Sequence, residues 1–140
     1  MLVARCWLLV EQITKGGWMK SYKDLDIYKL SFQLAMKIHE ISLKFPQYEL
    51  YEEGSQIRKS SKRVCACVVE GYGRKKYKND FIRFLVYSLA SCDETNLHLD
   101  FVHKAGYIND DLYQSLNREN DELGKKINKF IKFVETEWKE

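Results

Sequence analysis

Apolar residues recur every three or four positions in four long stretches of the chain, and short polar segments separate the stretches. The stretches span residues 26–45, 49–72, 78–105 and 110–138. This spacing places the apolar side chains on one face of an α-helix. Pro46 and Gly106 follow two of the stretches, Gly71 and Gly73 end another, and Asn109 suits the N-cap of the last. No stretch alternates as a strand would, so the pattern predicts an all-α protein.

The predicted helices are comparable in length, and the segments between them have only about three to five residues. Connections this short make neighbouring helices antiparallel. Four amphipathic helices bury their apolar faces best when they pack together. We therefore expect an antiparallel up-down-up-down four-helix bundle, formed as a single domain by residues 19–140.

The second predicted helix differs from the others because its apolar stripe is rich in small residues. The stripe consists of Leu50, Gly54, Ile57, Ser61, Val64, Val68 and Gly71. Small side chains let the backbone of a neighbouring helix come close. We therefore expect a neighbouring helix to approach this face closely.

Three predicted helices carry more apolar residues than one buried stripe requires. The additional residues are Tyr28, Phe32, Met36 and Leu43 in the first helix, Ile82, Val86 and Phe101 in the third, and Ile131 and Phe133 in the fourth. Apolar stripes that remain after a bundle has formed are typical of subunit interfaces. We therefore expect the protein to associate with itself.

Residues 1–18 differ from the predicted bundle. Their apolar run, residues 6–10, is far too short to cross a membrane and short even for a signal peptide. Met19 is an alternative start, because Lys15, Gly16 and Gly17 could be encoded by a purine-rich ribosome-binding sequence. We expect residues 1–18 to be a leader that adds little to the native structure, and the protein to be cytoplasmic with no membrane partner.

Positive charge is concentrated in one segment. Residues 58–83 contain nine Lys and Arg and two acidic residues, a net charge of +7, whereas the rest of the chain contains 14 and 18, a net charge of −4. The candidate phosphate contacts are Arg58, Lys59, Lys62, Arg63, Arg74, Lys75, Lys76 and Lys78. Phosphates would meet these cations, and unpaired bases could stack on the nearby Tyr72 and Tyr77. The same residues also fit a solvated face that prevents aggregation, or a surface for an acidic protein, and the residues alone leave these interpretations open.

No set of residues supplies the chemistry of an enzyme or a metal site. Cys65 and Cys67 point about 200° apart on a helix and cannot chelate one ion together. We interpret the cysteines as small buried residues in a reducing cytosol. His98 and His103 are five positions apart, which does not favour a shared metal, and we interpret them as surface or interface residues. No serine lies in a nucleophile motif. We expect no catalytic residue, no metal and no cofactor.

Glu70 and Glu94 are the remaining candidates for acid–base or metal chemistry. Helical di-metal sites need a Glu-x-x-His motif on facing helices, and the sequence contains none. We therefore interpret Glu70 as a structural carboxylate that pairs with Arg74 or Arg83, or that caps a helix end.

Two motifs place the chain beside a known family. The segments VVEGYGRKKYKNDFIRFL (residues 68–85) and SLASCDE (residues 88–94), together with the opening YKDLDIYKLSFQLAMKIHEIS, resemble the four-helix bundle proteins encoded in 23S ribosomal-RNA intervening sequences. The resemblance covers residues 19–139. The family signature falls on Glu70, Gly71, Gly73, Arg74, Phe81, Phe84, Leu85, Ser91 and Glu94. The chain departs from the pattern at Cys67, where the family usually has Asn, so a role of that amide does not carry over.

The resemblance implies a left-handed four-helix bundle that assembles as a homopentamer. The accessory protein of diversity-generating retroelements is similar in build, and its basic surface is associated with nucleic-acid binding. With this resemblance we expect a non-enzymatic homo-oligomer, a pentamer, that binds RNA or DNA electrostatically with little sequence preference. The alternative is a protein-binding or assembly module with no nucleic-acid role.

Overall fold

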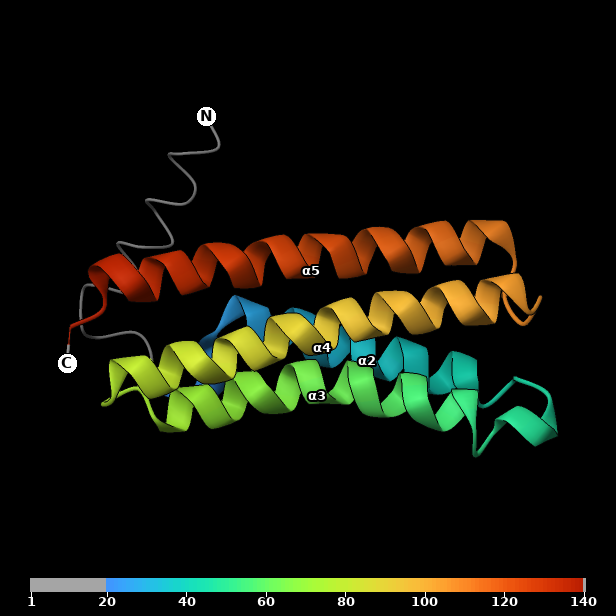
Figure 1. Ribbon diagram of the computed structural model, residues 1–140, viewed down its shortest axis with the longest axis horizontal. Coiled ribbons are helices and arrows are strands. Elements are labelled where there is room, and N and C mark those ends of the chain that lie inside the picture. The colour runs from blue at the N-terminus through green and yellow to red at the C-terminus, as the bar shows by residue number, and fades with distance from the viewer. Residues whose placement is uncertain (1–19, 140) are drawn as a thin grey trace.

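The computed structural model describes residues 20–139, which form four α-helices and two short 3-10 helices (Figure 1). The elements are η1 (Tyr22–Asp24), α2 (Asp26–Ser42), η2 (Gln47–Glu49), α3 (Glu53–Gly73), α4 (Lys78–Lys104) and α5 (Asp110–Glu137). No strand occurs in this range. The all-α prediction is confirmed, and the predicted leader, residues 1–18, lies outside the described residues.

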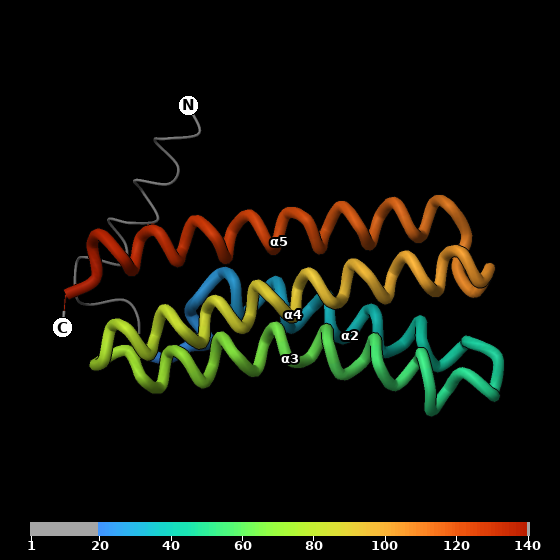
Figure 2. Tube along the Cα trace, in the orientation of Figure 1, coloured from blue at the N-terminus to red at the C-terminus, as the bar shows by residue number. Residues whose placement is uncertain are grey.

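The four helices form the predicted bundle. Successive helices lie alongside one another and run in opposite directions (Figure 2). Both α2 and α4 pack against α3 and against α5. The helices α2 and α4 therefore occupy diagonal corners of the bundle.

Two helix boundaries differ from the prediction by more than one residue, and they lie on either side of Pro46. The helix α2 ends at Ser42 instead of residue 45, and α3 begins at Glu53 instead of residue 49. A residue that precedes proline is disfavoured in the α-helical conformation, so the chain leaves the helix before Pro46 and makes the turn η2. Phe45 is nevertheless buried and closes this end of the core.

The core is apolar and continuous along the bundle axis. Its largest fully buried side chains include Phe81, Leu85, Leu99 and Ile127. The additional apolar residues predicted on the fourth helix, Ile131 and Phe133, are buried and belong to the core. Each helix keeps a polar face, and none of the helices within residues 20–139 is apolar enough over a sufficient length to cross a bilayer.

The helices α3 and α4 approach most closely through small side chains, as the sequence predicts. The Ser88 hydroxyl donates a hydrogen bond of 2.7 Å to the backbone carbonyl of Val64 on the facing helix. Two turns further along α4, the Thr95 hydroxyl donates to Ser60 Oγ over 3.0 Å. A short side chain can reach the backbone of the facing helix only where the two helices are close. These small residues therefore fix the register of α3 against α4.

A second polar link holds α5 against α4. The buried Asn120 amide donates to the Cys92 carbonyl over 2.9 Å, and the Cys92 thiol lies 3.3 Å from the Asn120 side-chain oxygen, to which it donates. Burial, aided by the charges of Asp93 and Asp121, raises the pKa of the Cys92 thiol to about 12. The thiol therefore stays protonated and keeps its role as a donor.

Replacing Gly71 by alanine tests the close approach of α3 and α4. A Cβ at this position would lie 3.1 Å from Phe84 Cβ and 3.4 Å from the Phe81 carbonyl oxygen, neither of which can move without a shift of α4. We expect Gly71→Ala to lower the free energy of unfolding by about 1–3 kcal/mol in urea denaturation. In the control Gly73→Ala the Cβ meets nothing within 4 Å, and the change should stay within about 1 kcal/mol. Equal stability of the two variants would contradict the close approach.

Candidate nucleic-acid interface

The basic residues predicted to contact phosphates fall into two groups, one on α3 and one in the connection that follows it. On α3, the side chains of Lys59, Lys62 and Arg63 are exposed on the outer face of the helix. Lys62 Nζ lies 3.1 Å from His39 Nδ1 of the adjacent α2. These three cations form a surface stripe that an anion could reach.

Arg58 has a different role from the predicted one. Its guanidinium donates to Ser42 Oγ at 2.9 Å and to the carbonyl of Leu50, and the side chain is half-buried. These bonds tie the start of α3 to the end of α2 and to the connection between them. The predicted contact of Arg58 with phosphate is therefore corrected, because both terminal nitrogens of its guanidinium bind groups inside the molecule.

The connection between α3 and α4 presents its cations on aromatic rings. The Arg74 guanidinium lies 4.3 Å from the centre of the Phe84 ring and donates to the Glu70 carbonyl over 3.1 Å. Lys75 Nζ lies 3.9 Å from the centre of the Tyr72 ring. Such contacts leave the charges at the surface and limit where the side chains can go. Lys76 is exposed, and Lys78 is half-buried at the first residue of α4.

An exposed tyrosine stands among these cations. Tyr77 is 62% exposed, and Lys76 Nζ lies 5.8 Å from the centre of its ring. Tyr72, the other predicted stacking residue, is buried against Phe81 and cannot accept a base. Only Tyr77 of the two keeps a ring available for stacking.

The end of α5 adds cations that the sequence analysis did not assign. Trp138 follows α5, donates from its indole nitrogen to the Lys75 carbonyl over 3.0 Å and packs on Phe81. The α3–α4 connection and the end of α5 therefore lie at one end of the bundle (Figure 1). Lys129 and Lys132 of α5 are exposed near this end. In the sequence, the spacing of these two lysines by three residues on the polar face of a helix could have indicated this basic patch.

We call this end of the molecule the basic end. It consists of Arg74, Lys75, Lys76, Tyr77, Lys129 and Lys132. Lys125 and Lys126, which precede these lysines on α5, are engaged with Glu122 at 3.7 Å and Asp26 at 3.0 Å. The basic end rests on buried aromatic residues and presents cations from two parts of the chain.

Comparison with known proteins agrees with this architecture. The family model described as 23S rRNA-intervening sequence protein matches residues 23–129, more than half of the chain. The chain belongs to this family.

A solved structure shows the same fold. It is the crystal structure of a protein of unknown function from the S23 ribosomal protein family of Bacteroides thetaiotaomicron, with 23% sequence identity and a TM-score of 0.66. The match covers 76% of this chain and 95% of that one. A search of curated proteins found no match.

The family signature in this chain maps mainly to the contact between α3 and α4. Gly71, Phe81, Leu85 and Ser91 are buried there, and Phe84 is half-buried beneath Arg74. The motif residues therefore explain how the two helices pack. Most of them are unavailable to a ligand.

Glu70 is not the paired carboxylate that we predicted. Its side chain is exposed and makes no ion pair with any residue of the described chain, and it caps no helix end there. Arg83 pairs with Asp80 over 2.8 Å, and Arg74 binds the Glu70 backbone. Glu70 precedes Gly71, which packs against Phe84 of α4. Glu94 lies ten residues beyond Phe84, about 15 Å along α4, so the two glutamates do not share a site.

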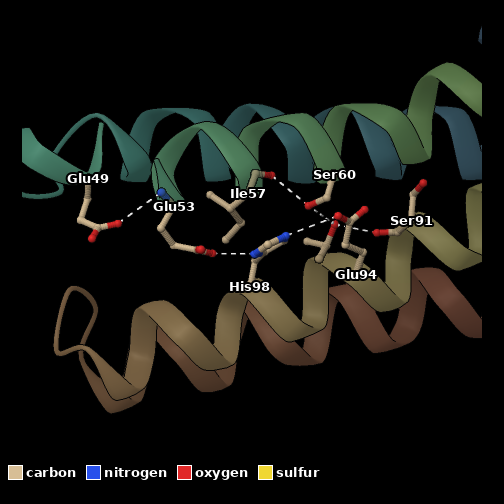
Figure 3. Close-up of polar contacts among 8 residues, drawn as sticks. Glu49, Glu53, Ile57, Ser60, Ser91, Glu94 and His98 are labelled. Carbon is tan, nitrogen blue, oxygen red and sulfur yellow. Dashed lines mark hydrogen bonds and ion pairs between the residues drawn. The ribbon is translucent and has the colours of Figure 1, made fainter. Parts of the chain in front are cut away.

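Among the acidic and basic side chains of residues 20–139, that of His98 is the most enclosed. It is only 8% exposed, which corrects its predicted surface position. Its Nδ1 lies 2.6 Å from Glu53 on α3 and its Nε2 lies 3.5 Å from Glu94 (Figure 3). The buried Nε2 has no hydrogen-bond partner among the described residues. Within residues 20–139 no group of three or more ligating side chains could hold a metal.

Exchanging Arg58 for methionine tests its structural role. The variant loses the two hydrogen bonds that Arg58 donates to Ser42 and to the Leu50 carbonyl. We expect the free energy of unfolding in urea to fall by about 1–3 kcal/mol. The control Lys59→Met removes the same charge from an adjacent exposed position and should change it by less than about 0.5 kcal/mol. Normal stability of Arg58→Met combined with a selective loss of RNA affinity would restore the phosphate contact.

Proposed function

We propose that this protein is a non-enzymatic, oligomeric four-helix bundle protein that binds RNA or DNA electrostatically through its basic end. The observation that carries the proposal is that Arg74, Lys75 and Lys76 flank the exposed Tyr77 in the α3–α4 connection, while Lys129 and Lys132 are exposed on α5 near the same end of the bundle. Cations hold phosphates without reading sequence, and an exposed ring can stack on an unpaired base. Lys59, Lys62 and Arg63 extend the positive surface along α3. We place the protein in the cytoplasm.

Oligomer formation is supported by two exposed apolar stripes. On α2, the side chains of Phe32, Met36 and Leu43 are 50%, 41% and 55% exposed. On α4, the exposed apolar residues are Val86, Leu97 and Phe101. Successive residues of the stripe lie four and seven positions apart on α2, and eleven and four positions apart on α4, so each set lies on one outer face. Water contact with such stripes is unfavourable, so a second copy of the chain would stabilise them.

The positions of the stripes favour a ring over a two-fold dimer. The helices α2 and α4 occupy diagonal corners, so their outer faces point away from each other. When the α2 stripe of one copy packs on the α4 stripe of the next, each copy uses two unlike surfaces. Such heterologous contacts form a closed ring when the rotation between successive copies divides a full turn, and an open filament otherwise. A homopentamer is a closed ring of this kind.

The assembly is tested by mass and by one substitution. We expect sedimentation at micromolar concentration to give a mass several times the 16.7 kDa of the monomer. Met36→Glu should reduce this mass to that of the monomer, because a carboxylate would be desolvated at the interface. The control Gln33→Glu lies on the polar side of the same helix and should leave the mass unchanged. A monodisperse wild-type monomer would refute the proposal.

Nucleic-acid binding is tested through its dependence on salt. We expect the affinity for a labelled single-stranded RNA to fall steeply as salt rises, because each phosphate contact releases counterions. The double variant Lys75→Glu/Lys76→Glu should bind more weakly and lower the slope of log affinity against log salt by about 1–2. The control Lys44→Glu/Lys104→Glu changes two exposed lysines outside the basic end and should bind nearly as the wild type does.

Two outcomes would contradict this function. No binding of the wild type at low salt would refute a nucleic-acid role and favour the protein-binding alternative. Equal loss in both double variants would show that net charge alone acts, and that the basic end is not the site.

A further inference from the structure

A groove lies at the opposite end of the bundle from the basic end. It has a volume of about 590 Å³ and is formed by η2, the start of α3, the last turns of α4 and the turn after α4. Its lining residues are Glu49, Tyr51, Glu52, Glu53, Gln56, Phe101, Ala105 and Tyr107. The lining contains three carboxylates and three aromatic rings, and it contains neither lysine nor arginine. We call it the acidic groove.

The carboxylates of the acidic groove lack lysine and arginine partners among the described residues. Glu53 faces His98, and Glu49 accepts the backbone N–H of Glu53 over 3.2 Å. Glu52 is exposed. Within the described chain, none of the three pairs with a lysine or an arginine. The bonds to His98 and to the Glu53 backbone fix two of the carboxylates in place, but they bring no permanent positive charge to the groove.

Exposed aromatic rings border the same carboxylates. Tyr51 is 83% exposed and Phe101 is 51% exposed, which is unusual for large rings on a folded surface. A lysine or arginine side chain gains from both kinds of neighbour, since its charge pairs with a carboxylate and also lies favourably on a ring face. The groove therefore has the chemistry to hold a short cationic segment.

A segment of this chemistry lies in the connection between α3 and α4. Residues 74–78 read Arg-Lys-Lys-Tyr-Lys and carry four cations. They cannot reach the groove of their own molecule, because the 21 residues of α3 separate the two ends by about 30 Å. A second copy has no such restriction. Its basic segment can approach the groove end to end.

We propose that the acidic groove receives the α3–α4 connection of a second copy of this chain, so that molecules associate end to end. The contact would lie at the end of the bundle and adjoin the α4 apolar stripe at Phe101, which belongs to both surfaces. The other residues of the apolar stripes lie outside the groove. If the proposed nucleic-acid function holds, the same cations serve both partners. Nucleic acid and the groove then compete for residues 74–78, and binding of RNA would dissociate the end-to-end contact.

The first experiment measures the groove directly. The probe is a labelled synthetic peptide with the sequence of residues 72–80, titrated into the full chain at about 10 mM salt, where the Debye length is about 30 Å. We expect saturable binding that disappears at about 1 M salt. Glu52→Lys should weaken it at least about tenfold. The control Glu40→Lys makes the same charge change on an exposed position outside the groove and should retain binding.

The second experiment measures the intact protein. The sedimentation mass of the wild type should be larger at low salt than at high salt, and both Lys76→Glu and Glu52→Lys should abolish that difference. The double variant Lys76→Glu/Glu52→Lys exchanges the charges of the two partners and should restore it. Excess single-stranded RNA should remove it from the wild type. Contacts through the apolar stripes do not weaken at high salt, so the difference reports the charged ends.

The outcomes separate this proposal from the proposed function. Equal peptide binding by Glu52→Lys and wild type, or a mass that does not change with salt, would overturn the end-to-end contact. RNA binding should survive in Glu52→Lys, because Glu52 lies outside the basic end. If the wild type failed to bind RNA, that result would refute the nucleic-acid function and leave the end-to-end contact standing. If an unrelated lysine-rich peptide bound the groove while the mass stayed constant, the occupant would be a foreign basic segment, and the second copy would be excluded.

Discussion

The close approach of α3 and α4 is the constraint on which both ends of the molecule depend. Hydroxyl groups of Ser88 and Thr95 reach across to α3, and Gly71 leaves room for Phe81 and Phe84. A larger residue on either side would move the helices apart. Because the contact runs along most of both antiparallel helices, it places the end of each helix beside the start of the other. The basic connection leaves one end, and the start of α3 meets the last turns of α4 at the other.

The basic end and the acidic groove lie at opposite ends of the bundle axis. The cations of the basic end rest on aromatic rings that are themselves packed on the core, as Arg74 on Phe84 shows. The carboxylates of the acidic groove are fixed by other contacts, as the pair of Glu53 with His98 shows. In both places a buried or half-buried neighbour restricts a charged side chain. Restricted charges lose less entropy when a partner binds, which strengthens otherwise weak surface interactions.

The sequence predicted the fold well because periodicity and helix stops are local properties. The small-residue stripe of α3 also indicated that a neighbouring helix approaches it closely. Other features depend on which neighbours meet. Periodicity marked Ile131, Phe133 and Phe32 alike as surplus, but only the first two found a place in the core. Nothing local shows that Arg58 binds the carbonyl of Leu50, or that His98 lies between two glutamates. The basic end also escaped prediction in part, because Trp138 joins segments 63 residues apart.

The two proposed partners of residues 74–78 need no conformational change to influence each other. The helices that join the ends are continuous, and the core between them is closely packed, so a signal carried through the bundle would have to deform it. Competition for the same cations avoids this requirement, because occupancy by one partner excludes the other. A phosphate chain offers one negative charge per nucleotide along its length, whereas the groove offers three carboxylates. Nucleic acid should therefore prevail wherever both are present at comparable concentration, and the end-to-end contact should belong to the unliganded protein.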